Sequence, residues 1–251
     1  MNIVATLNLV KLHPKASERI QPFFEQILSE HQAKIHSLVV TGTAITEDFD
    51  SKKSDVNSII VLKEMDLRFL EAIAPLGKKY GKQKVAAPLI MIPEYITGSL
   101  DVFPIEFFNF KLIHHTAFGE EILDNIEIHS RNLRHQCEWE IKTKLIGLRQ
   151  GYLAAQADRR LLSEKFGSII TGDIPLFRGI IFLLQKQTPI QQSVVIQVLS
   201  EAVAIDTSVF STALQVKQKK IKPSIDEFNE IFENYYAALE KLGRIVDEIT
   251  I

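Results

Sequence analysis

The sequence predicts an α/β domain followed by an all-α helical bundle. Short apolar runs typical of strands alternate with helical apolar spacing as far as Gly119. From Arg131 onward the strand signals disappear, and helical spacing recurs along the rest of the chain. We therefore expect an α/β domain at residues 1–123 and a helical bundle at residues 124–251, with the boundary between Gly119 and Ser130.

The first elements of the α/β domain are a helix and two strands. Apolar residues at helical spacing predict a helix from Ile20 to His31, with Pro22 in its first turn, where a missing N–H costs little. Two β-branched runs, Ile35–Thr41 and Val56–Leu62, are typical of buried strands.

The next part of the chain continues the alternation. A helix should begin near Leu67 and fade at the glycines that follow it. Val85–Ile92 is the next expected strand, and Pro88 should force it to an edge or a bulge. Pro93–Ile96 resembles a short helical turn, and the apolar run Leu100–Phe110 should supply a further strand.

Two capping-box patterns indicate helix starts in the second half of the chain. Both Thr188-Pro189-Ile190-Gln191 and Ser224-Ile225-Asp226-Glu227 place a hydroxyl three residues before Gln or Glu. Apolar residues follow the second pattern at helical spacing. We expect five or six helices packed as a bundle.

Composition and charge exclude several classes of protein. The 251 residues have a net charge of -2, so no bulk basic field favours nucleic acid or an anionic membrane, although a local patch stays open. The single Cys137 leaves no internal disulfide and no multi-cysteine metal site. No apolar run approaches the roughly 18 residues of a membrane span, and the N-terminus has no signal-peptide pattern. We expect a cytoplasmic protein without a membrane partner.

The stretch from Ser37 to Leu62 holds the candidate site. Gly42 ends the first strand, where the backbone must turn sharply or approach a ligand closely. Asp55 and Asn57 lie two residues apart at the start of the second strand, so their side chains should share one face. Such a pair beside a Gly-Thr turn is able to hold a metal and a phosphate together, while the alternative role of Asp55 is an ordinary strand-entry turn.

These residues resemble the nucleotidyltransferase fold, the DNA polymerase beta-like superfamily. That family has a Gly-Ser turn, followed by Asp-x-Asp at the start of the next strand and a third carboxylate on a later strand. In this chain Thr43 replaces the Ser and keeps the hydroxyl, and Asn57 replaces the second Asp and removes a charge. Glu106 best matches the third carboxylate, with Asp101 as a second candidate. The resemblance covers roughly the first half of the chain.

The resemblance implies a mixed sheet with helices that binds a nucleoside triphosphate with Mg²⁺. Asp55, Asn57 and Glu106 would hold the metal and carry the chemistry, because Mg²⁺ prefers oxygen ligands from one or two carboxylates plus phosphates. Gly42, Thr43 and Ser54 would seat the phosphates. With Asn57 in place of an acid, either one metal suffices, or another acid helps, or the site no longer catalyses.

Three hypotheses follow for function. The first is a Mg²⁺-dependent enzyme that transfers a nucleotide to an acceptor, and the second is a catalytically degenerate protein that binds a nucleotide or a protein partner. The third is a helical interaction protein in which the first domain is only a scaffold. The acceptor, the base preference and the oligomeric state, including a homo-oligomer, stay open.

Two further features have alternative explanations. The charged loop Thr43–Lys53 suits either a solvated turn or a lid over a nucleotide. His114 and His115 are adjacent, and adjacent strand residues point to opposite faces, which argues against a metal site that uses both.

Overall fold

The computed structural model describes residues 6–155, 158, 161, 166–167, 172–218 and 220–250. The chain divides into two compact units, Met1–Ile128 and His129–Ile251. Residues 124–128 therefore lie in the first unit, whereas we expected them to begin the second. That each unit folds by itself stays a prediction.

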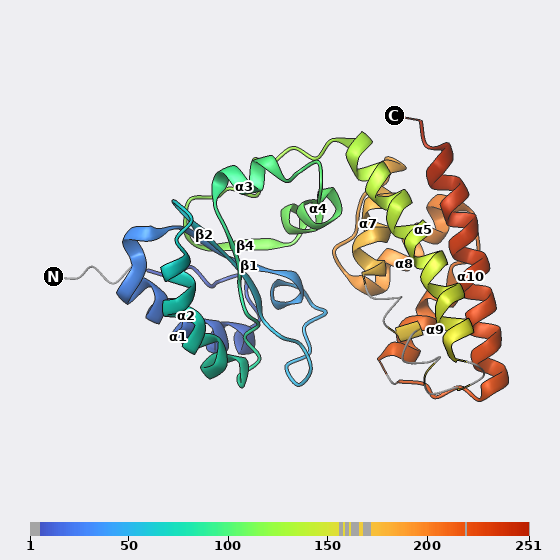
Figure 1. The fold of residues 1–251 in the computed structure, drawn as a ribbon, viewed down its shortest axis with the longest axis horizontal. Helices are drawn as coiled ribbons and strands as arrows, with labels where there is room; N and C mark the ends of the chain where they lie inside the picture. The colour runs from blue at the N-terminus through green and yellow to red at the C-terminus, as the bar shows by residue number, and fades with distance from the viewer. Residues whose placement is uncertain are drawn as a thin grey trace. The chain divides into compact units, whose positions relative to one another are not determined.

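The first unit is built on a four-stranded mixed sheet with the order β3-β2-β1-β4. Figure 1 shows this unit and labels β1, β2 and β4. Strands β1 (Ile35–Thr41) and β2 (Asn57–Leu62) lie where the sequence predicts them. They pair antiparallel, β4 (His114–Gly119) pairs antiparallel with β1, and β3 (Leu89–Met91) pairs parallel with β2 at the sheet edge. The edge position of β3 agrees with the presence of Pro88 just before it.

Helices cover both faces of this sheet. Leu38, Val40 and Ile60 pack with apolar residues of α1 (Pro14–His31) and α2 (Leu67–Gly81). On the other face, Val39, Ile59 and Val61 pack with residues of α3 (Pro93–Gly98) and α4 (Pro104–Leu112). Short 3-10 turns, Gln32–Lys34 and Gly42–Ile45, precede and follow β1.

Two predicted boundaries in the first unit are wrong. Helix α1 begins at Pro14, so Pro22 lies inside it and not in its first turn. The helical spacing does not reveal this start, because Ala16 is the only apolar residue between Pro14 and Ile20. The apolar run Leu100–Phe110 forms a turn and α4 instead of a strand, because Pro104 at the first helical position starts a short helix that is apolar on most sides.

The structure gives the bounds of five helices in the second unit. They are α5 (Ser130–Ala155), α7 (Asp173–Leu183), α8 (Gln192–Val203), α9 (Ser208–Lys217) and α10 (Ile225–Glu248). The capping box at Ser224 is confirmed, with both reciprocal hydrogen bonds present. The box predicted at Thr188 is wrong, because α8 begins at Gln192 and the Arg178 guanidinium instead donates to the carbonyls of Pro189 and Ile190.

The core of the second unit combines an aromatic cluster with a buried ionic contact. Phe166 and Phe210 each pack edge to face against Tyr235, with ring centroids 5.1 and 5.3 Å from the Tyr235 ring. The Lys144 ammonium of α5 lies 3.0 Å from Asp173 Oδ1 of α7, an ion pair without the alignment of a hydrogen bond. The Tyr235 hydroxyl of α10 donates to Asp173 Oδ2 at 2.9 Å. These contacts tie three helices together.

No helix among the described residues is long and apolar enough to cross a membrane.

Candidate functional site

The Gly42 turn ends β1 in a conformation that requires glycine. Gly42 has φ +74, in the left-handed region, and its N–H donates to the Ile113 carbonyl at 3.2 Å. The next residues, including Thr43, form the 3-10 turn that leaves the sheet. A Cβ added at Gly42 would lie 3.8 Å from the Asn57 amide nitrogen, so the turn and the Asn57 side chain are neighbours.

Asp55 and Asn57 flank a buried residue. Both are exposed, whereas Val56 between them is fully buried and bridges to Val85. This alternation places the carboxylate and the amide on the side opposite Val56.

Three polar side chains form a row across the sheet at this end. Thr41 pairs with Asn57 on β2 and with His114 on β4. Directly opposed residues share a face of a sheet, and this is the face that carries Val39 and Ile59. Asn57, Thr41 and His114 therefore lie side by side, although the sequence does not show that His114 belongs to the row.

The loop between Thr43 and Asp55 is anchored to α1. Phe49 is buried in the core on that face, and the Arg19 guanidinium donates to the carbonyls of Ser51 and Ser54. The Ser54 hydroxyl accepts the N–H of Asp50 at 3.0 Å. The Lys52 N–H bonds to the Asp50 carboxylate and lowers its pKa. These contacts fix the approach to Asp55, and they argue for a packed loop over either a solvated turn or a free lid.

Glu106 does not lie on a strand. It is exposed in the first turn of α4, and Asp101 is exposed in the turn before that helix. Strands β3 and β4, which follow β2 in the chain, contain no Asp or Glu among their residues. The expected third carboxylate on a later strand is therefore absent from both.

The structure brings together a second cluster of side chains that the sequence does not predict. His114, Glu121 and Asp124 each present a ligand atom within 4.8 Å of the others. His115 lies on the opposite face, where its Nε2 lies 2.9 Å from the Asn8 carbonyl, and burial lowers its pKa. The two histidines lie on opposite faces, as expected, but the prediction did not consider the acidic residues that follow the strand.

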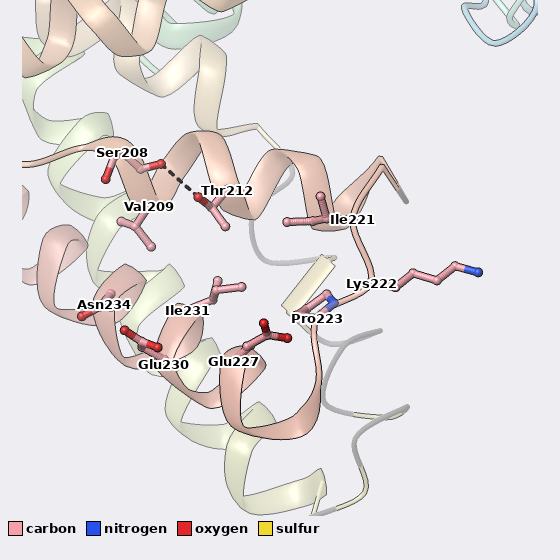
Figure 2. Close-up of a pocket in the computed structure, with 10 residues that line it drawn as sticks. All are labelled: Ser208, Val209, Thr212, Ile221, Lys222, Pro223, Glu227, Glu230, Ile231 and Asn234. Carbon is pink, nitrogen blue, oxygen red and sulfur yellow. Dashed lines mark hydrogen bonds between the residues drawn. The ribbon is translucent and has the colours of Figure 1, made fainter.

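The helical unit has a groove of about 520 Å³ between α9 and α10 (Figure 2). Its walls mix apolar and polar side chains, and Figure 2 shows Lys222 extending away from the hollow. Glu227 in its wall accepts the Ser224 N–H of the capping box. The polar groups of this groove do not converge on one point, so it does not define a ligand.

No protein-family model matches the chain. No curated protein matches it either. Among solved structures, it is similar to the spectinomycin adenyltransferase AAD(9) from Enterococcus faecialis, crystallised with ATP and spectinomycin. The match has a TM-score of 0.56 and 12% sequence identity, and covers 92% of this chain and 99% of that one. The chain therefore has a nucleotidyltransferase fold, with a mixed sheet followed by a helical region.

Proposed function

We propose that this chain binds a magnesium–nucleoside triphosphate at the Gly42 turn and transfers the nucleotide to an acceptor. The observation that carries the proposal is the placement of the Asn57 amide against the Gly42 turn, with the exposed Asp55 two residues earlier. The similarity to an adenyltransferase that holds ATP makes ATP the first nucleotide to test, and spectinomycin the first acceptor.

The residues present suit Mg²⁺ held largely by its nucleotide. Asp55 offers one carboxylate and Asn57 an amide oxygen, and Mg²⁺ in such sites is commonly held by one or two carboxylates plus phosphates. When bound, the ion would neutralise charge on the phosphates. Gly42 lets a phosphate approach the backbone, the Thr43 hydroxyl is a hydrogen-bond donor, and Ser54 holds the loop that presents Asp55.

We leave Glu106 out of the proposed ligand set, because it lies in the first turn of α4 and not on a strand.

A second candidate function is nucleotide binding without transfer. It is favoured by Asn57 and by the lack of Asp or Glu on β3 and β4. Of the three acids in the nucleotidyltransferase pattern, only Asp55, just before β2, then has a match at the expected place. The two candidates share the nucleotide site and differ only at the chemical step.

Asp55→Asn should weaken ATP binding in the presence of Mg²⁺ by at least about tenfold, or roughly 1.4 kcal/mol. The substitution keeps the size of the side chain and removes the carboxylate that faces the cation. Titration calorimetry of the parent and the variant measures the change. Asp101→Asn is the matched control, since Asp101 is also exposed but lies in the turn before α4, and it should bind as the parent does. Equal losses in both variants would place the site elsewhere.

Asn57→Asp should tighten Mg²⁺-dependent ATP binding and raise nucleotide transfer, because it restores an acid beside Asp55 with little change in packing. Binding is measured by calorimetry, and transfer by pyrophosphate release with spectinomycin as acceptor. A parent that binds ATP but releases no pyrophosphate favours the second candidate. If the variant instead loses about 1–3 kcal/mol of stability with unchanged Mg²⁺ affinity, Asn57 is a structural hydrogen-bond donor and not a ligand.

A further inference from the structure

One imidazole and two carboxylates lie close together where β4 meets the segment that follows it. The His114 Nε2 lies 3.0 Å from Glu121 Oε1 and 3.7 Å from Asp124 Oδ1. All three residues belong to the first unit. They come from the first residue of β4 and from the turn just after the strand.

The orientation of the His114 ring is fixed from outside this cluster. Its Nδ1 lies 3.0 Å from the Lys111 carbonyl oxygen, which only accepts hydrogen bonds, so Nδ1 carries the ring proton. In the neutral ring, Nε2 then presents a lone pair. The side chain is only 7% exposed, and this lone pair points at two carboxylates that are also acceptors. The 3.0 Å contact between Nε2 and Glu121 Oε1 therefore requires a shared cation, either a second ring proton or a metal ion.

Glu121 is held as firmly as the ring. Its Oε2 accepts the Thr116 hydroxyl, and its Oε1 accepts the N–H of Leu123 at 2.9 Å. Asp124, by contrast, is 69% exposed, so the cluster opens to solvent on one side. Two fixed ligand atoms and one exposed carboxylate at an open edge leave positions for water around an ion.

We propose that His114, Glu121 and Asp124 bind a divalent transition-metal ion, with Zn²⁺ as the best fit. One imidazole nitrogen and two carboxylate oxygens suit Zn²⁺ and its neighbours, whereas Mg²⁺ and Ca²⁺ prefer oxygen ligands throughout. The Lys111 carbonyl supplies the hydrogen bond that metal-ligating histidines make through their other nitrogen. The ion ties the start of β4 to the turn that leaves the sheet.

This site is distinct from the magnesium site of the proposed function. His114 and Asn57 both pair with Thr41, from opposite sides, so they are separated by two strand spacings. At about 4.8 Å for each spacing, their backbones lie roughly 10 Å apart. The transition-metal ion therefore lies on the same face of the sheet as the nucleotide site without sharing its ligands.

The test is a titration of the full chain, stripped with a chelator, with Zn²⁺ by calorimetry and with Co²⁺ by visible absorption. We expect one ion per chain and no displacement by an equal concentration of Mg²⁺. His114→Ala and Glu121→Gln should weaken binding at least about 100-fold, and Asp124→Asn about tenfold. If His114→Ala fails to fold, the other two variants carry the test, since Asp124 is exposed.

Two controls separate this site from its neighbours. Glu120→Gln changes the adjacent, 85% exposed acid, whose Oε2 lies 3.6 Å from His36, and it should bind Zn²⁺ as the parent does. Asp55→Asn should also leave Zn²⁺ affinity unchanged, so failure of the nucleotide proposal does not affect this result. The proposal is overturned if no saturable binding occurs, if binding survives all three ligand variants, or if either control abolishes it. Absence of binding would mean that the cluster is a hydrogen-bonded group and not a metal site.

Discussion

Lys144→Met should lower the free energy of unfolding by about 3–5 kcal/mol at neutral pH, because it breaks a buried ion pair from one side. The Lys144 and Asp173 side chains are 7% and 1% exposed, so neither charge is hydrated by bulk water. Without the Lys144 ammonium, Asp173 keeps the hydrogen bond from Tyr235 and the weaker attraction of Lys217, but loses the cation that contacts it directly. Chemical denaturation of the parent and the variant measures the difference.

The cost of Lys144→Met should shrink as the pH falls. Burial raises the pKa of Asp173 above its ordinary value of 3.8, although the charge of Lys144 and the hydrogen bond from Tyr235 oppose the shift. The folded chain therefore keeps this proton at pH values where the unfolded chain has released it. Stability from this group is fully present below about 3.8 and is lost as the pH rises through the folded pKa. Removing Lys144 raises that pKa further, so acid restores part of the lost stability.

Two further variants control this prediction. Lys142→Met removes an exposed lysine of the same helix that pairs with Glu138, and it should cost less than about 1 kcal/mol. The double variant Lys144→Met, Asp173→Asn removes both charges and keeps an acceptor for Tyr235, so it should recover most of the loss. Equal, small costs at Lys142 and Lys144 would show that the contact contributes little.

The parts of the fold that the sequence predicts are those with strong local signals. The β-branched runs define β1 and β2, and the capping box at Ser224 defines the start of α10. The wrong predictions concern segments whose local pattern is ambiguous. Most residues of helix α4 are apolar, so its sequence resembles that of a strand. Strand β4 begins with two histidines and lacks the apolar alternation of a strand.

The residues of the candidate site also fall into those with a local sequence signal and those without one. Gly42, Asp55 and Asn57 are recognisable because a turn residue and a polar pair flank two clear strands. His114 joins the row only through the pairing of β4 with β1, which no local pattern encodes. Because the sequence does not predict β4, it also does not indicate the cluster of His114, Glu121 and Asp124. That cluster consists of a histidine on a strand and two acidic residues after the strand.

Gly119→Ala should lower the free energy of unfolding by roughly 3 kcal/mol or more, because strain and a backbone clash add. Gly119 has φ +83, which is costly for any residue with a Cβ. An added Cβ would also lie 2.0 Å from the His36 carbonyl oxygen and 2.8 Å from the Ser37 Cα. Both atoms belong to the backbone where β1 pairs with β4, so they cannot move aside without breaking the pairing.

Gly42→Ala is the matched control, since it shares the backbone strain without the clash. Gly42 has φ +74, but the nearest atom to its added Cβ is the Asn57 amide nitrogen at 3.8 Å, an ordinary contact. We expect a cost of about 1–2 kcal/mol there, from the left-handed conformation alone. Urea unfolding of the two variants beside the parent measures both values. Equal costs would mean that the backbone near Gly119, where β1 pairs with β4, adjusts freely. Gly119 would then be required only for its dihedral angle.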